Sequence, residues 1–149
     1  RSVIVNMSSL FAWVSMPTQS IYNASKAALR AFSDGLRQEL ADTNVTVLCV
    51  HPGGVKTNIA RSAKYGDVSM VATSSASMIQ MFDQHAETTP EAAAEAICQA
   101  IEKGRTRLMI GRDARVVDWV YRLMPAGASA WFTKTVKRRR EKAERSAKR

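Results

Sequence analysis

The sequence predicts an α/β fold with about three parallel strands, flanking helices and a basic helical tail. Two apolar, β-branched runs, Val3–Val5 and Val45–Val50, have the continuous hydrophobicity of strands that a parallel sheet buries on both faces. Between them a helical pattern starts near Ser20, with apolar residues three or four positions apart: Leu29, Phe32, Leu36 and Leu40. Strand, helix and strand in this order are typical of a right-handed βαβ unit.

The elements that follow carry their own boundary signals. Residues 56–87 are rich in Ser, Ala and Met, and we expect a partly helical flap there. The next helix has Thr89 as its N-cap and Gly104 as its stop signal. The run "RLMIG" at 107–111 then predicts a third strand.

Two further helical stretches are expected after the third strand. Asp113 is the expected N-cap of the first stretch, which ends at Pro125. One apolar stripe is predicted on it, formed by Val116, Val117, Val120, Leu123 and Met124. The second stretch starts near residue 128 and continues into the charged tail.

The charge of the chain is concentrated in that tail. Of the net charge of +9 over 149 residues, Lys134–Arg149 supplies +7, from nine basic and two acidic residues. The body is therefore near neutral. Three interpretations of the tail stay open: a solvated end, a contact with an anionic membrane through Trp131, Phe132 and Val136, or non-specific nucleic acid binding. Nucleic acid ranks last, because no aromatic residues alternate with the basic ones.

The remaining composition excludes several classes of protein. No apolar run approaches the roughly 18 to 20 residues that span a bilayer, and the first residues do not have the layout of a signal peptide. Cys49, Cys98, His51 and His85 do not have metal-ligand or triad spacing, so we expect no metal site. We expect a cytoplasmic protein, with membrane association of the tail left open.

Polar residues follow both strands of the βαβ unit, as "NMSS" at 6–9 and "HPGG" at 51–54. The carboxyl ends of parallel strands meet at one edge of the sheet, where open α/β sheets bind ligands. Tyr22 and Lys26 stand about one turn apart at the start of the connecting helix, and we expect both to face the sheet. A nearby cation favours the phenolate form of a tyrosine, which can then exchange a proton with an alcohol or carbonyl oxygen.

Three motifs together resemble the carboxyl-terminal half of a short-chain dehydrogenase/reductase. They are "NMSS", a Tyr-x-x-x-Lys helix whose tyrosine follows the second serine by thirteen positions, and "PGGVKT" at 52–57. Each is weak alone, but the three in order at the family's spacing are a strong signal. The match is close from Val3 to Thr57 and looser through Ile110. It implies half of a Rossmann-like, doubly wound parallel sheet.

The resemblance also implies catalytic roles. Ser9 would orient and polarise the substrate oxygen, and Tyr22 would be the general acid/base. Lys26 would support the tyrosine and hydrogen-bond the nicotinamide ribose, so that Tyr22 and Lys26 also bind the cofactor. Asn6 resembles the family's structural asparagine, and Ser8 is expected to be a loop hydroxyl.

The remaining cofactor contacts are assigned to the second strand end. Pro52 and Gly53 would shape the turn under the nicotinamide, and the backbone of Val55 would meet the carboxamide. Thr57 would lie near the carboxamide or the pyrophosphate. The cofactor is NAD or NADP, and the residues that select between them in the family precede the strand with which this sequence starts.

The implied function is an NAD(P)-dependent oxidoreductase that interconverts a secondary alcohol and a ketone by hydride transfer. Because the family's Gly-rich phosphate turn is absent here, we expect residues 1–112 to be a partial Rossmann-like catalytic half-domain and residues 113–149 a helical extension with a basic tail. Such a fragment alone is expected to be inactive. The alternative is a noncatalytic, family-like scaffold whose tail contacts a membrane or a partner.

The resemblance implies partners as well. The substrate would be a small alcohol or ketone, with an apolar substrate surface among Met70, Met78 and Met81 left open against ordinary core packing. A homo-oligomer would form through the Tyr22 helix, so we expect an apolar patch on that helix. No specific nucleic acid partner is expected.

Overall fold

The computed structural model describes residues 2–64 and 74–147, and its centre is a parallel sheet. The sheet contains β1 (Ser2–Met7), β2 (Val45–Pro52) and β3 (Arg107–Ile110), side by side in chain order. Both pairings are parallel. The predicted fold class and strand order are therefore confirmed.

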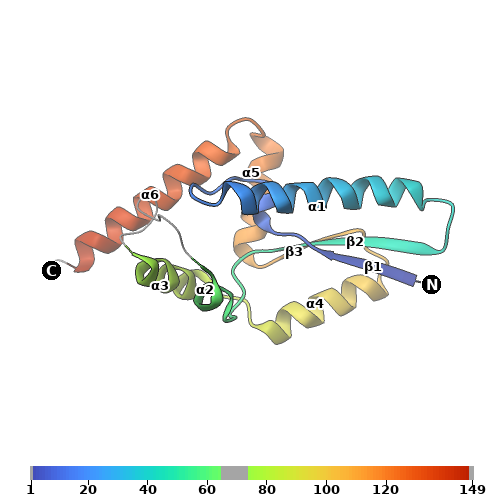
Figure 1. Ribbon diagram of the computed structural model, residues 1–149, viewed down its shortest axis with the longest axis horizontal. Helices are drawn as coiled ribbons and strands as arrows, with labels where there is room; N and C mark the ends of the chain where they lie inside the picture. Colours follow the sequence, from blue (N-terminus) through green and yellow to red (C-terminus); the bar gives the residue numbers. More distant parts are fainter. Residues whose placement is uncertain (1, 65–73, 148–149) are drawn as a thin grey trace.

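Helices cover both faces of this sheet (Figure 1). On one face lies α1 (Ser20–Glu39), and on the opposite face lies α4 (Pro90–Glu102). The flap contains α2 (Ile59–Ser62) and α3 (Ser75–His85). A short 3-10 helix, η1 (Leu10–Ala12), follows β1, and α5 (Arg112–Leu123) and α6 (Ala128–Ala147) follow β3.

The middle strand β2 is the centre of the core. Its residues from Val47 to Val50 are at most 1% exposed, as is His51. Leu48 and Val50 pack with Ala93 and Ala100 of α4, which uses small residues to approach the sheet closely. The strand also runs two residues beyond the predicted end at Val50, because Pro52 is paired with Ile110 of β3.

The predicted boundaries of α4 are confirmed by its caps. The Thr89 side chain accepts a hydrogen bond from the backbone N–H of Ala92, and Gly104 adopts a left-handed φ of 61°. The prediction for α5 is wrong at its start. The N-cap is Gly111, with φ 94°, and Asp113 lies inside the first turn with its carboxylate directed elsewhere.

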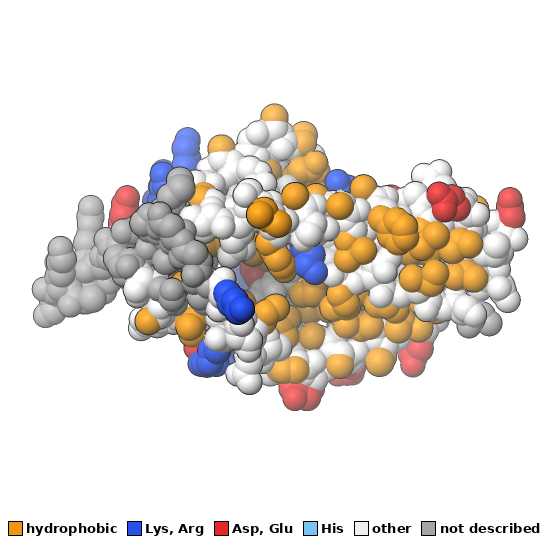
Figure 2. Space-filling model, in the orientation of Figure 1, with side chains coloured by type: hydrophobic (Ala, Val, Ile, Leu, Met, Phe, Trp, Pro, Cys, Tyr) orange, Lys and Arg blue, Asp and Glu red, His pale blue; other side chains and the backbone are white. Residues whose placement is uncertain are grey.

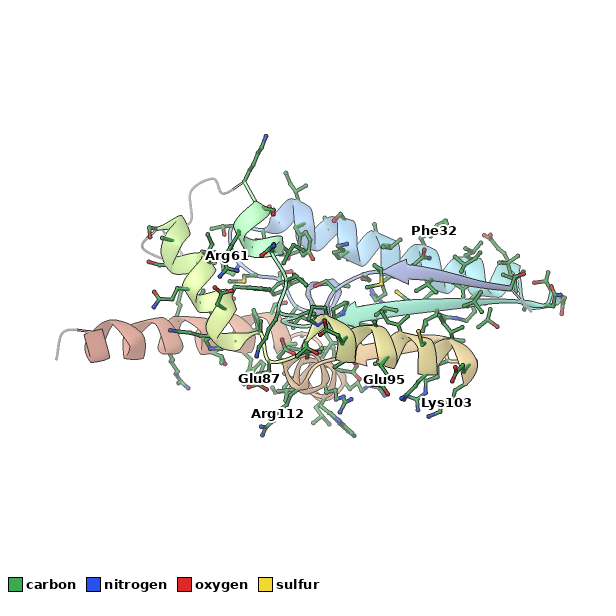
Figure 3. The ribbon with its side chains drawn as sticks, turned by 90° about the horizontal axis from the view of Figure 1, so that it is seen from below. Phe32, Arg61, Glu87, Glu95, Lys103 and Arg112 are labelled. Carbon is green, nitrogen blue, oxygen red and sulfur yellow. The ribbon has the colours of Figure 1, made fainter. Side chains whose placement is uncertain are left out.

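The apolar stripe predicted on α5 is divided between the core and the surface. Val117 is buried against Leu10 and Val14 of the chain after β1, whereas Val116 and Leu123 are 46% and 75% exposed. Phe32 on α1 is likewise 58% exposed, on the outer side of the helix (Figure 3). Periodicity predicted these helices correctly, but it overestimated the width of their buried faces.

Apolar side chains gather over α1 and β1, as predicted for the Tyr22 helix (Figure 2). Ile21 of α1 is 86% exposed, and Ile4 and Met7 of β1 are also exposed. Within the described residues β1 pairs only with β2, so its other edge is open. Open strand edges and apolar patches of this kind are suited to contacts with further protein.

Two of the three apolar residues of α6 that suggested a membrane contact, Phe132 and Val136, pack inward. Phe132 contacts Phe11, and Phe132 and Val136 pack beside Met16 and Met78. Met70 lies outside the described residues. Along the helices that the structure describes, there is no stretch with the length and hydrophobicity needed to cross a bilayer.

Shortening a buried side chain of the central strand β2 should destabilise the protein. Leu48→Ala removes a fully buried side chain and leaves a cavity, so we expect the free energy of unfolding to fall by about 2–5 kcal/mol. Leu123→Ala makes the same chemical change at an exposed position and should stay within about 0.5 kcal/mol. Urea unfolding followed by circular dichroism measures both, and equal losses would contradict the burial described above.

Candidate functional site

Two buried serines follow β1 at its carboxyl end, and their hydroxyls have different partners. Ser8 donates its backbone N–H to the carbonyl of Val50 (2.8 Å) and its hydroxyl to the carbonyl of Lys26 (2.9 Å). The Ser9 hydroxyl instead accepts from the backbone N–H of Phe11 (3.1 Å). The proton of Ser8 is therefore used in joining β1 to α1. That of Ser9 has no acceptor among the described residues and is available to a ligand there.

Tyr22 and Lys26 are brought together in the first turns of α1. The Lys26 ammonium lies 5.5 Å from the centre of the Tyr22 ring and donates to the carbonyl of Met7 (3.0 Å) at the end of β1. The Tyr22 ring is 38% exposed and makes an edge contact with Phe11. The lysine thus faces the sheet as expected, whereas the phenol lies where a ligand can reach it.

The "HPGG" turn lies at the same edge of the sheet and is held by residues distant in sequence. Gly53 donates its N–H to Ile110 of β3 (2.8 Å), and Gly54 donates to a carboxylate oxygen of Asp113 (2.7 Å). A Cβ atom on Gly53 would overlap that carboxylate. Asp113 is therefore a supporting residue that the sequence analysis interpreted only as a helix cap.

The segment after the turn continues along the same edge. Val55 forms a parallel bridge with Thr88, and the N–H of Lys56 donates to the Thr88 carbonyl (2.8 Å). Thr57 is exposed and accepts from the N–H of Ile59 (3.4 Å). The ion pair between Arg61 and Asp83 (2.6 Å) links α2 to α3 in the flap (Figure 3).

His51 is buried directly beneath the site, and its pKa is lowered from 6.5 to about 4. Burial is the main cause, because it disfavours the charged imidazolium, and the nearby cations Arg107 and Arg30 act in the same direction. Its Nδ1 lies 3.2 Å from both the indole nitrogen of Trp13 and the carbonyl of Ser9. The ring therefore braces the backbone that carries Ser9.

Trp13 makes cation–π contacts with two arginines beside this histidine. The guanidinium carbons of Arg30 and Arg107 lie 4.4 and 4.3 Å from the centre of its ring. Asp118 of α5 forms ion pairs with Arg107 and Arg122. Cation–π contacts and ion pairs thus connect α1, β3 and α5 around the chain that leaves Ser9.

The structure brings the predicted residues to one edge of the sheet in two groups: Ser9, Tyr22 and Lys26 after β1, and Pro52, Gly53, Val55 and Thr57 at and after the end of β2. The described residues contain no group of three or more His, Cys, Asp or Glu side chains that could hold a metal ion. The available groups are suited to proton transfer and hydrogen bonding.

Comparisons with known proteins agree with this arrangement. Residues 1–67 match a family model described as short chain dehydrogenase. Over 124 residues the chain is 44% identical to the "Putative oxidoreductase SadH" of Mycobacterium tuberculosis. The aligned region covers 81% of this chain and 44% of that protein.

Solved structures show the same fold. A short chain dehydrogenase from Burkholderia cenocepacia, in complex with NADP, superposes with a TM-score of 0.65 at 24% identity, over 86% of this chain and 46% of the other. A short chain dehydrogenase/reductase from Burkholderia phymatum, in complex with NAD, gives a TM-score of 0.61 at 22% identity, over 83% and 49%. The chain thus spans about half the length of the proteins that it matches.

The buried imidazole should make stability depend on pH. The unfolded chain binds a proton at His51 near pH 6.5, but the folded chain binds it only near pH 4. Protonation therefore favours unfolding. The contribution of neutral His51 to the free energy of unfolding is complete above pH 6.5 and falls by about 3 kcal/mol as the pH drops toward 4.

This dependence is measured by urea unfolding between pH 5 and 7, with His51→Gln as the non-titrating comparison. We expect the wild-type protein to lose more stability than the variant as the pH falls. An NMR titration that gave His51 a pKa near 6.5 would refute the account.

The contact between Gly53 and Asp113 can be tested by a double-mutant cycle. We expect Gly53→Ala to destabilise the protein by about 1–3 kcal/mol, because the added methyl group displaces the carboxylate. In an Asp113→Ala background the same substitution should cost markedly less. Gly35→Ala, at a helical position with open space around it, should instead stabilise by up to about 1 kcal/mol. If the effects of Gly53→Ala and Asp113→Ala on the free energy of unfolding were additive, the contact between the two residues would be contradicted.

Proposed function

This chain belongs to the short-chain dehydrogenase/reductase family, and we propose that it supplies the catalytic part of an NAD(P)-dependent oxidoreductase. The reaction is the interconversion of a secondary alcohol and a ketone. The observation that carries the proposal is the Tyr22–Lys26 pair, with the ammonium 5.5 Å from the ring centre, beside a Ser9 hydroxyl whose proton is free.

In this mechanism Tyr22 exchanges a proton with the substrate oxygen. As an alcohol is oxidised, Tyr22 takes the hydroxyl proton as the general base, and the positive charge of Lys26 lies beside its ring. The Ser9 hydroxyl donates a hydrogen bond to the same oxygen and fixes its position. In ketone reduction the proton returns from Tyr22 to the oxygen. The nicotinamide cofactor, when bound, accepts or gives the hydride.

The residues at this edge fit a dinucleotide by their chemistry. Lys26 has three N–H donors and spends one on the Met7 carbonyl, which leaves two for the hydroxyls of a ribose. The missing side chains of Gly53 and Gly54 make room for the Asp113 carboxylate and for Ala86, so that the turn proposed to lie under the nicotinamide is held in one shape. Pro52, Val55 and Thr57 complete the proposed contact surface. The two Burkholderia structures bind NADP and NAD, so either cofactor is compatible with the proposal.

We further propose that the exposed apolar face of α1 is an interface in a homo-oligomer. Ile21 and Phe32 are 86% and 58% exposed there, which is costly for large apolar side chains in water. We also retain the division into a catalytic half-domain, residues 1–112, and a helical extension, residues 113–149. The two parts share a core through the contacts of Leu10 and Val14 with Ala114 and Val117.

Substitution of the tyrosine tests the proposed chemistry in the whole protein. Tyr22→Phe removes the exchangeable proton with little change of shape, and we expect kcat/KM for secondary alcohols to fall by about 10²–10⁴-fold. Tyr121→Phe makes the same change on α5, beside Trp13, and should leave the rate nearly unchanged. Hydride transfer is followed by nicotinamide absorbance with NAD and with NADP. A Tyr22→Phe enzyme with the wild-type rate would end the assignment.

A further inference from the structure

A second candidate site lies on the other side of the Phe11 ring from Tyr22. A cavity of about 820 Å³ opens between the start of α1, the chain from Phe11 to Thr18 and the first half of α6. These segments meet where α6 passes the amino-terminal end of α1 (Figure 1). Ser9, Tyr22 and Lys26 do not line it.

The cavity exists because the two helices present small side chains to each other. Ala24 and Ala27 line it from α1, and Ser129 and Ala130 line it from α6. Larger apolar side chains close the remaining wall: Phe11, Trp13, Met16 and Pro17. A volume near 800 Å³ with mostly apolar walls lies within the range typical of small-molecule sites, which is about 300–1,000 Å³.

Positive charge marks one part of the cavity lining. Lys134 and Lys137 stand three residues apart on the same side of α6, and both line the cavity. No acidic residue is among the lining residues, and neither lysine forms an ion pair within the part of the chain that the structure describes. The cavity therefore combines an apolar interior with two cations that have no anionic partner there.

Asn23 is a buried polar residue in the wall of the cavity. This side chain is 6% exposed and lines the cavity, and its amide nitrogen donates to the Met16 carbonyl (3.0 Å). Its Oδ1 atom accepts no hydrogen bond from the described residues. This oxygen has almost no accessible surface, so it belongs to the wall of the cavity and not to the surface that a ligand would contact.

We propose that this cavity binds a single-chain amphiphile with an anionic head group. The hydrocarbon chain lies against Phe11, Trp13 and Met16, and the carboxylate or phosphate pairs with Lys134 and Lys137. Phe11 lies between the bound molecule and the Tyr22 ring, whose centre is 6.3 Å from its own. The site does not depend on the proposed oxidoreductase activity, because none of the reacting residues belongs to it.

Trp13 provides a direct measurement of binding. Dibromostearate, whose bromine atoms quench nearby indoles, is titrated below its critical micelle concentration into protein carrying Trp119→Phe and Trp131→Phe. These substitutions remove the two tryptophans that do not line the cavity, so that Trp13 is the one indole left. We expect saturable quenching. Palmitate, hexadecyl phosphate and hexadecanol then compete for the site, and both anions should compete about tenfold better than the alcohol, which corresponds to about 1.4 kcal/mol.

Matched variants separate the cavity from general hydrophobicity. Ala27→Phe fills the space and should weaken quenching by about tenfold or more, whereas Ala31→Phe places the same ring one turn along α1, outside the cavity, and should change little. If Ala27→Phe does not fold by circular dichroism, Ala130→Phe fills the cavity from the α6 wall.

Charge variants test the head group. Lys134→Gln with Lys137→Gln should abolish the preference for anions while hexadecanol competes as before. Lys103→Gln, on the exposed end of α4, is the control (Figure 3). Absence of saturable quenching, equal competition by hexadecanol and the anions, or equal effects of Ala27→Phe and Ala31→Phe would each overturn the proposal.

Discussion

The parallel register of β1 and β2 is the constraint on which the rest of the site depends. Met7 stands opposite Val50, and Ser8 continues the ladder by donating to the Val50 carbonyl. Both strands therefore end at one level, so that the serines after β1 and the glycine turn after β2 emerge side by side. A slip by one residue would exchange the two faces of β1 and carry Ser9 away from α1. The burial of the middle of β2, from Val47 to His51, makes such a slip unfavourable.

Local signals were sufficient to predict the secondary-structure elements and to select residues that the structure brings to one edge of the sheet. Continuous apolar runs predicted the strands, Thr89 and Gly104 predicted the ends of α4, and the fixed spacing from Ser9 to Tyr22 selected the serine whose proton is free. These features are encoded within one element or one βαβ unit. Their geometry follows from periodicity and from strand direction.

Contacts between distant segments were beyond such reasoning. Asp113 reaches Gly54 across 59 positions, and His51 meets Trp13 across 38, and neither pair has a recognisable sequence motif. The exposure of Val116 and Leu123 was also missed, because a helical apolar pattern identifies a face without identifying what covers it. The electrostatic surroundings of His51 required coordinates as well, since Arg30 of α1 and Arg107 of β3 are distant in sequence and both lie against the ring of Trp13.

The carboxylate of Asp113 has a consequence for how relatives of this protein can be recombined. It belongs to the helical extension by sequence, yet it occupies the space above Gly53 and fixes the turn assigned to the nicotinamide. A chimera that joined this sheet to the extension of another family member would inherit a foreign side chain at that position. The glycine turn and the first turn of α5 therefore form one inherited unit, and crossover points that separate them should be avoided.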